Sequence, residues 1–407
     1  MRIDLLRRID YFIGIPACFL LSVFETLNKA IFNKKNGEQP PKKIIILEFS
    51  EMGSIILACS AIEKIKQLYP GTTLYFWTFQ DKSEVFDLLN IIPKNNLIFM
   101  RNKNIFTICI DAVRNLHRIR KEKIDTAIDL ELFARFSAIL AYLSGAKNRV
   151  GFYRFSSEGL YRGNLHSHKV SYSPYLHISR NFLSLVYSLK AGIKDAPLLK
   201  ECLANDPVVI PEVKLNLKAK EDILKKLKII NPGITGKNKI VILNPGIGES
   251  LPIRAWPGRY YMGIAKKILT NKDIFIVVIG KEAGFSEETE ILKRFSGGRI
   301  LNLTGKTNLE ELIALLSISI MLISHDSGTC HLASLTGIYM IVLFGPENPM
   351  LYAPLNSNLK ILYSNLACSP CITAHNHRHS VCRDNKCLKM ISVEEVYAVA
   401  KNILDRP

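Results

Sequence analysis

The sequence predicts an α/β protein with two doubly wound, Rossmann-like domains that face a common cleft, preceded by a membrane-associated segment. Three observations support this. The length of 407 residues suits two domains of average size. Apolar runs of strand length alternate with helical stretches in two successive series. Small polar turns follow the runs, as in parallel sheets that bind ligands at the carboxyl ends of their strands.

The first series predicts an N-terminal domain over residues 42–210. KIIILEF (43–49) has the length and apolar continuity of a buried strand and is followed by the turn SEMGS. The next stretch keeps its apolar residues three or four apart, which predicts one helix through Ile55, Cys59, Ile62, Ile65 and Tyr69. Further strands are predicted at TLYFWTF, NLIFM and DTAIDL.

The second series predicts a C-terminal domain over residues 211–407. Its strands are predicted at 239–246, 274–280, 299–305, 318–324 and 339–346. Thr307 with Glu310, and Ser392 with Glu395, have capping-box spacing and place helix starts near Asn308 and Val393. We expect a hinge between the domains within residues 205–238.

Residues 1–41 predict a membrane-associated segment and a linker. The uncharged run from Tyr11 to Phe24 is flanked by basic residues on both sides. It is shorter than the roughly 18 residues of a spanning helix, and Pro16 interrupts it. The pattern favours a membrane-surface or re-entrant anchor. The alternative is an amphipathic helix packed on the protein's own core. NKKNGEQPPKK (33–43) is typical of a linker.

The charge balance predicts a polyanionic partner. Lys and Arg total 54 against 36 Asp and Glu, a formal net charge of +18. Nucleic acid, an anionic membrane surface and phosphorylated ligands all fit this charge. The chain has neither aromatic-rich RNA motifs nor a recognisable helix-turn-helix, so we expect no nucleic-acid partner. RNLHRIRKEK (114–123) would suit an anionic lipid surface.

Polar residues gather after the strands of the second domain, and we expect them to converge on one ligand site. Glycine beside a helix start admits a phosphate, and arginine or lysine offsets its charge. An acidic residue can accept hydrogen bonds from ribose or another sugar. The alternative for the turn at 326–331 is an Asx turn with a core histidine. The predicted site comprises Asn244, Gly246, Arg254, Gly280, Glu282, Thr304, Gly305, Lys306, Asp326, Ser327, Gly328 and His331.

These motifs carry a family resemblance. NPG with RAWP, LTGKTNLEEL, HDSGTCHLA and LFGPENP, together with IDLELFARFSA and SGAKNRVGF in the first domain, resemble glycosyltransferase family 9 over most of residues 42–405. Its best-known members are ADP-heptose:lipopolysaccharide heptosyltransferases. The resemblance implies the GT-B architecture, a nucleotide-sugar donor with ADP favoured, and donor contacts from Asp326, Gly328 and His331. It also places Arg254 where a donor-phosphate lysine is common, and Glu282 at the nucleoside.

The resemblance further implies inverting transfer without a catalytic metal, to a lipopolysaccharide-type or lipid-linked acceptor at the cytoplasmic face of a bacterial inner membrane. In the family the first turn usually reads Gly-Asp, and that aspartate is taken as the general base; here the turn is SEMGSII, with Ser54 in its place. A serine is a poor base unless another group relays the proton. Glu51, Asp129 and Glu131 are the candidate replacements, and Glu51 is favoured because it shares the turn.

A cysteine-rich loop lies at residues 368–387. Cys368, Cys371, Cys382 and Cys387 have C-x2-C and C-x4-C spacing, with three histidines between the pairs. A structural zinc, reduced unligated thiols and disulfides are the alternatives, and disulfides are disfavoured in a cytosolic protein.

The sequence leaves three other functions open. Ser54 would fit a catalytically silent nucleotide-sugar binding protein. A sugar epimerase would use a similar two-domain scaffold without an acceptor. A nucleic-acid binder would use the cysteine loop as a zinc module, but the missing recognition motifs weigh against it.

Overall fold

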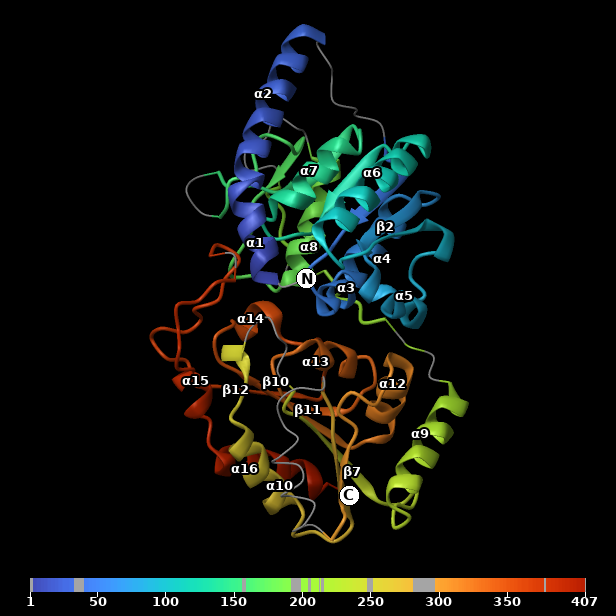
Figure 1. Ribbon diagram of the computed structural model, residues 1–407, viewed down its shortest axis with the longest axis vertical. Helices are drawn as coiled ribbons and strands as arrows, with labels where there is room; N and C mark the ends of the chain where they lie inside the picture. Colours follow the sequence, from blue (N-terminus) through green and yellow to red (C-terminus); the bar gives the residue numbers. More distant parts are fainter. Residues whose placement is uncertain are drawn as a thin grey trace. The chain divides into compact units, whose positions relative to one another are not determined.

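The computed structural model describes residues 3–32, 40–155, 159–191, 199–203, 206–211, 213, 216–246, 252–280, 297–376 and 378–406. The chain forms two compact units. The first comprises residues 1–209 with 373–379, and the second comprises 210–372 with 380–407. Figure 1 shows a parallel sheet with helices around it in each unit.

The first unit is built on a parallel sheet of six strands in the order β3-β2-β1-β4-β5-β6. Such strands are buried on both faces, which explains the nearly continuous apolar runs of β1 and β2. The four strands predicted in this region are present, whereas β5 and β6 were not predicted as strands because their runs are short and polar. The strands are β1 Lys43–Leu47, β2 Thr73–Phe79, β3 Leu97–Met100, β4 Thr126–Asp129, β5 Asn148–Phe152 and β6 His168–Val170.

Helices pack on both faces of this sheet. The single helix predicted after β1 is two helices, α3 Met52–Leu57 and α4 Cys59–Leu68, which meet at Ala58. On one face α7 contacts both α6 and α2, so these three form one layer. The remaining bounds are α5 Ser83–Leu89, α6 Ile105–Lys121, α7 Arg135–Leu143 and α8 Ile178–Tyr187, with short 3-10 turns η1 Gln80–Lys82, η2 Lys94–Asn96 and η3 Ser188–Lys190.

The N-terminal segment forms two helices, α1 Ile3–Phe12 and α2 Gly14–Phe32. Leu5–Ile31, 27 residues, is long and apolar enough to cross a membrane by length and composition. The apolar helix is thus longer than the uncharged run from Tyr11 to Phe24, and the surface or re-entrant anchor stays a prediction. Pro16 lies in the first turn of α2, where its missing N–H breaks no helical hydrogen bond. Most of the predicted linker, 33–43, lies outside the described residues.

The second unit contains another parallel sheet of six strands, in the order β12-β11-β10-β7-β8-β9. The five predicted strands are present; the edge strand β12 is only partly buried and was not predicted. The strands are β7 Lys239–Asn244, β8 Ile274–Val278, β9 Ile300–Asn302, β10 Met321–His325, β11 Tyr339–Phe344 and β12 Leu359–Tyr363.

The helix starts of this unit show how capping residues act. Ser392 caps α16 by accepting the Glu395 N–H, as predicted. At α12 the prediction was off by one residue, because the capping box joins Asn308 to Glu311 and not Thr307 to Glu310. The described elements are α9 Leu217–Ile230, η4 Pro252–Arg254, α10 Gly258–Ile268, α12 Leu309–Ile318, α13 Gly328–Ala333, α14 Pro349–Tyr352, α15 Lys386–Lys389 and α16 Val393–Leu404.

Candidate functional site

The turns after β7, β8, β9 and β10 lie at one edge of the second sheet, because these strands are parallel and adjacent. Asn244 ends β7 and is buried. Its side-chain amide donates to the hydroxyls of Ser324 and Ser327, both at 3.1 Å. The polar turns after β7 and β10 are thus joined by side-chain hydrogen bonds. Neighbouring residues on these turns are brought together as the sequence predicts.

Glycines let these turns approach one another closely. Gly280 has φ +144°, and a Cβ there would lie 2.9 Å from the Cα of Gly246. On the other side, the Gly305 N–H donates to the Gly280 carbonyl at 2.9 Å. Thr304 is held by its N–H, which donates to Asn302 Oδ1 at 2.9 Å. A side chain at Gly280 would push the turns after β7 and β8 apart, so glycine there keeps the backbone of the two turns close together at this edge.

Arg254 and Asp326 form an ion pair on this edge. The Arg254 Nε lies 3.1 Å from Asp326 Oδ2, and Nη2 donates to the same oxygen. Asp326 is buried and Arg254 is mostly so. Burial, and then the charge of Arg254, lower the pKa of the adjacent His325 to about 4, so His325 is neutral at neutral pH. The two hydrogen bonds to Asp326 hold the Arg254 guanidinium in place. Both residues were named from the sequence, but their pairing was not predicted.

The other predicted donor residues take different positions. Gly328 begins α13, a helix of six residues, and His331 is buried on it. Lys306 is exposed, with its carbonyl accepting from Lys226 Nζ. Glu282 lies outside the described residues. Their assignments as donor contacts stay predictions.

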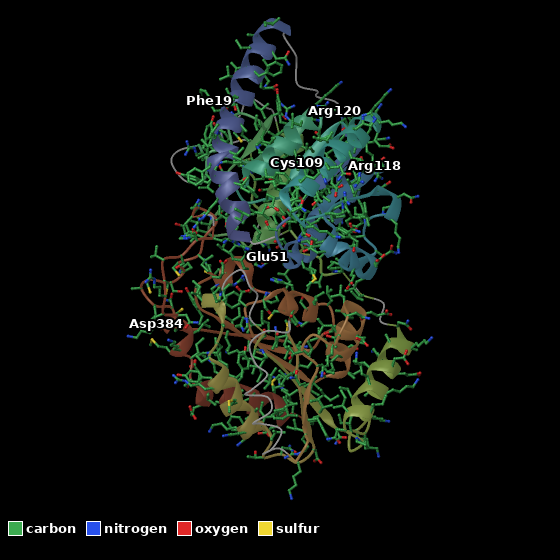
Figure 2. The ribbon with its side chains drawn as sticks, in the orientation of Figure 1. Phe19, Glu51, Cys109, Arg118, Arg120 and Asp384 are labelled. Atoms are coloured by element: carbon green, nitrogen blue, oxygen red, sulfur yellow. The ribbon has the colours of Figure 1, made fainter. Side chains whose placement is uncertain are left out.

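In the first unit, Glu51 ends the turn between β1 and α3, and Ser54, at the position where the base was expected, lies in α3. Glu51 is the N-cap of α3, and Ser54 lies in its first turn with its N–H bonded to the Glu51 carbonyl. Arg378, on the 373–379 segment of this unit, donates to Glu51 Oε1 at 2.6 Å. The favoured candidate is thus already engaged by a guanidinium. Figure 2 labels Glu51 on this turn.

Asp129 is wholly buried at the end of β4. Its Oδ2 accepts from Arg162 and from the Ser137 hydroxyl, and lies 3.3 Å from His166 Nε2. Burial raises the pKa of Asp129, but the charge of Arg162 and the His166 contact outweigh this, and the pKa lies below its usual value. These contacts leave Asp129 no oxygen at the surface, so we do not retain it as a base.

Glu131 lies two residues further on and has a partner that the sequence analysis missed. Its Oε2 accepts from the hydroxyl of the exposed Ser50 at 2.5 Å, and Oε1 accepts from the Phe49 N–H at 2.6 Å. The buried Glu48 lies beside it and accepts from the Ser50 N–H at 3.1 Å. For Glu48 the sequence signal was a glutamate within the apolar run KIIILEF, and strand patterning alone does not distinguish it from a solvated turn residue.

The four loop cysteines are free thiols. Burial raises the pKa of Cys387, and the nearby thiols of Cys371, Cys382 and Cys368 act in the same direction. No three or more metal-ligating side chains in the described ranges are arranged to hold a metal ion. His375 instead packs against Phe133 and Tyr172 of the first unit. A structural zinc in this loop stays a prediction.

Comparison with known proteins shows which proteins the chain resembles. The family model described as glycosyltransferase family 9 (heptosyltransferase) matches residues 113–381, more than half of the chain. Lipooligosaccharide heptosyltransferase 2 of Campylobacter jejuni is 30% identical over 199 residues, which are 47% of this chain and 61% of the relative. Lipopolysaccharide heptosyltransferase 2 of Salmonella typhimurium is 22% identical over 326 residues, 79% of this chain and 87% of the relative. The chain thus spans less than two thirds of the Campylobacter relative.

Two solved structures share the fold. ADP-heptose lps heptosyltransferase II of E. coli aligns with a TM-score of 0.66 at 17% identity, covering 89% of this chain and 98% of that one. The glycosyl transferase family 9 structure from Veillonella parvula aligns with a TM-score of 0.67 at 18% identity, covering 91% and 99%. At these identities the likeness establishes the two-domain α/β fold.

Proposed function

Because the chain belongs to glycosyltransferase family 9, we propose that it is an inverting glycosyltransferase that moves a heptose from an ADP-linked donor to a lipopolysaccharide-type acceptor. The observation that carries the proposal is the edge of the second sheet. There the buried Asn244–Ser324–Ser327 bonds, the close glycine turns and the Arg254–Asp326 pair form one polar surface. The names of the relatives supply the sugar, the nucleotide and the acceptor.

The chemistry of this surface suits departure of a nucleoside diphosphate. Transfer breaks the bond between the anomeric carbon and a phosphate oxygen, so negative charge develops on the leaving phosphate. A fixed guanidinium stabilises such charge without reorganising at the moment of reaction. Asp326 accepts hydrogen bonds from two nitrogens of the Arg254 guanidinium. Lys306, which directly follows Gly305 in the sequence, adds a second cation. Inverting transfer needs no covalent intermediate, so no nucleophile triad is required.

Calorimetric titration with ADP-, UDP- and GDP-linked sugars tests the donor site. We expect the ADP-linked sugar to bind, and Arg254→Ala to weaken binding at least tenfold because a charge-assisted contact is worth about 1.5–3 kcal/mol. Thr270→Ala, which removes an exposed hydroxyl at the end of α10, is the matched control. If no nucleotide sugar binds the folded protein, the donor assignment fails.

A transfer assay separates the remaining functions. Purified protein, ADP-heptose and a heptose-free lipopolysaccharide acceptor should give an acceptor heavier by one heptosyl group in mass spectrometry. Donor binding without a product would favour the silent binding protein. An altered donor sugar formed without acceptor would favour the epimerase.

We further propose that α2 lies flat on an anionic membrane surface at the cytoplasmic side. One side of α2 is docked on the first unit: Asn164 N–H donates to Ser22 Oγ at 2.7 Å, and Arg149 pairs with Glu25 at 2.8 Å. Gly163, at φ +63°, admits α2 so closely that a Cβ would lie 2.6 Å from the Cys18 carbonyl. The opposite side exposes Phe19, Leu20, Val23, Phe24, Leu27 and Ile31, and Phe12 at the end of α1 and Ile13 before α2 are exposed as well.

These contacts distinguish a flat orientation from a spanning one. An α2 that spans the membrane would have to leave the first unit. This would break the ion pair between Arg149 and Glu25 and leave both charges unpaired. A flat α2 keeps the ion pair and buries its apolar side in the interface. Figure 2 marks Phe19 on this helix.

Helix α6 extends the same surface. It belongs to the α2–α7–α6 layer and exposes Phe106 and Val113, each about 70% accessible. Its last turn carries Arg118, Arg120 and Lys121, and Figure 2 labels the two arginines with the exposed Cys109. Apolar side chains with a basic fringe match an anionic headgroup region.

Co-sedimentation with vesicles tests the membrane proposal. We expect binding to vesicles containing phosphatidylglycerol, weaker binding to pure phosphatidylcholine, and loss with rising salt. Phe19→Ser with Phe24→Ser should reduce binding about tenfold or more, because each buried aromatic contributes roughly 1.5–3 kcal/mol. Ile229→Ser, an even more exposed apolar residue on α9 of the second unit, is the control. Resistance of the membrane-bound protein to alkaline carbonate would instead indicate a spanning helix.

A further inference from the structure

Ser50 and Glu131 connect the surface of the first unit to a buried carboxylate. Ser50 is exposed in the turn after β1, and Glu131 follows β4, the strand paired with β1. The Ser50 hydroxyl donates to Glu131 Oε2 at 2.5 Å. Glu131 is only 5% accessible and its other oxygen is held by the Phe49 N–H. The carboxylate is therefore fixed in place, with the serine hydroxyl between it and solvent.

Glu131 lies beside a second buried carboxyl, that of Glu48, and their surroundings decide which of the two is charged. Burial, and then the charge of Glu131, raise the pKa of Glu48 well above its usual value. Burial also raises the pKa of Glu131, although bonds from Ser50 and Phe49 act against it. Two buried carboxyls this close do not both ionise readily. Both carboxyls accept hydrogen bonds that favour the charged form, Glu131 from Ser50 and Phe49 and Glu48 from the Ser50 and Glu51 N–H groups, but the pKa of Glu48 is raised further, so Glu48 holds a proton more readily than Glu131.

The other charged groups around the pair are few. Asp129 adds negative charge beside Glu131, and Lys82 acts on Glu48 from η1. Arg162 donates to the backbone carbonyl of Glu131 at 3.3 Å, and its other partners are Asp129, Ser137 and the Phe152 carbonyl. A carboxylate with a raised pKa accepts a proton at neutral pH better than an ordinary one does.

We propose that Ser50 and Glu131 form a proton relay that supplies the general base of the transfer reaction. The inference rests on the proposed function. The acceptor hydroxyl gives its proton to Ser50 Oγ while Ser50 passes its own proton to Glu131 Oε2. The acceptor oxygen forms its bond to the anomeric carbon of the donor, and the carbon–oxygen bond to phosphate breaks with its electron pair leaving on the nucleoside diphosphate. Protons and charge balance, with Glu131 neutral at the end.

The relay accounts for the serine at position 54. Glu51, the other carboxylate of the turn, is engaged by Arg378, and Asp129 has no oxygen at the surface. Ser50 lies in the turn after β1, four residues before Ser54 in α3, so a base acting through it serves the same end of the sheet.

The transfer assay with ADP-heptose and a heptose-free acceptor tests the relay in four variants: Ser50→Ala, Ser50→Thr, Glu131→Gln and the double change Ser50→Ala with Glu131→Gln. We expect Ser50→Ala and Glu131→Gln each to lower kcat by about 10²–10³-fold, the usual contribution of general base catalysis. The double variant should be no slower than the slower single one, because both remove the same relay. Ser50→Thr keeps a hydroxyl and should retain most of the activity.

Two further measurements distinguish a relay from a structural role. The wild-type kcat should fall with decreasing pH as Glu131 becomes protonated, with a midpoint above that of an ordinary glutamate, and Glu131→Gln should abolish this acid limb. The KM for the donor should stay within about threefold in all variants. Thr72→Ala is the matched control, since its hydroxyl bonds the Pro41 carbonyl at the opposite end of the same sheet.

The outcomes separate this inference from the proposed function. A wild-type protein that transfers nothing overturns the proposed function itself. An active wild type with Ser50→Ala within threefold of it overturns the relay, and so do single effects that multiply in the double variant. Because Ser50 is exposed, Ser50→Ala should fold even if Glu131→Gln does not, and its circular dichroism and melting temperature verify this.

Discussion

At the scale of single residues, buried charges of this protein are stabilised by several partners at once. Asp111 on α6 is fully buried and accepts from the Arg101 N–H and from both Nε and Nη2 of that residue, at 2.8–2.9 Å. Arg114 adds a contact at 3.0 Å. Hydrogen bonds from Arg101 lower the pKa of Asp111 to about 2. This aspartate ties α6 to the end of β3.

We therefore predict that Asp111→Asn destabilises the protein by about 2 kcal/mol at pH 7, because hydrogen bonds to a charged group are lost. A depressed pKa contributes stability above the unfolded-state pKa, and that contribution is lost as pH falls toward the folded-state value. The difference between wild type and variant should thus shrink from about pH 4 to about pH 2. Urea denaturation across this range measures it, and a difference independent of pH would contradict the account.

At the scale of elements, helix starts are set by one side chain in the right place. Asn308 Oδ1 accepts from the Glu311 N–H at 2.8 Å, and Glu311 Oε2 accepts from the Asn308 N–H at 3.1 Å. Glu311 also binds Lys226 of α9, so the cap joins α12 to α9. The sequence-based prediction named only the pair Thr307 with Glu310, and the neighbouring pair Asn308 with Glu311, which has the same spacing, is the one that the folded backbone uses.

Asn308→Ala should lower the free energy of unfolding by about 1 kcal/mol, the usual cost of losing an N-cap. Thr307→Ala, at the neighbouring position that the sequence pattern favoured, should change it by a few tenths of a kcal/mol at most. Chemical denaturation of the two variants side by side measures both. Equal losses would mean that the cap is shared.

At the scale of the whole molecule, each unit has its own hydrophobic core. The first unit packs Trp77, Phe49 and Leu140 among its core residues, and the second packs Trp256, Tyr261 and Val396. Separate cores allow the units to unfold separately. We expect ligand binding in one unit to stabilise that unit directly.

Calorimetry should accordingly resolve two unfolding transitions, and an ADP-linked sugar should raise the one that belongs to the second unit. At a free concentration 100 times Kd the stabilisation is about 2.7 kcal/mol. Hydrogen exchange of peptides from β7 and β10, compared with β1 and β4, assigns the transitions. Equal protection of both units would contradict donor binding by the second unit alone.

The sequence by itself determined the two series of parallel strands, the family and the edge of the second sheet where polar turns gather. These features follow from local patterns: apolar runs fix buried strands, and glycines mark close turns. The edge strand β12 was not predicted because it is short and only partly buried, so its pattern of burial is weak.

Only the tertiary structure decided how side chains pair. It joined Ser50 to Glu131 across 81 positions, Arg254 to Asp326 across 72, and Arg149 to Glu25 across 124. It also showed that one side of α2 is docked and the other exposed, which composition cannot reveal. Such pairings depend on which strand and helix ends meet in space. The order of residue types along the chain does not reveal how close two elements lie when they are far apart in sequence.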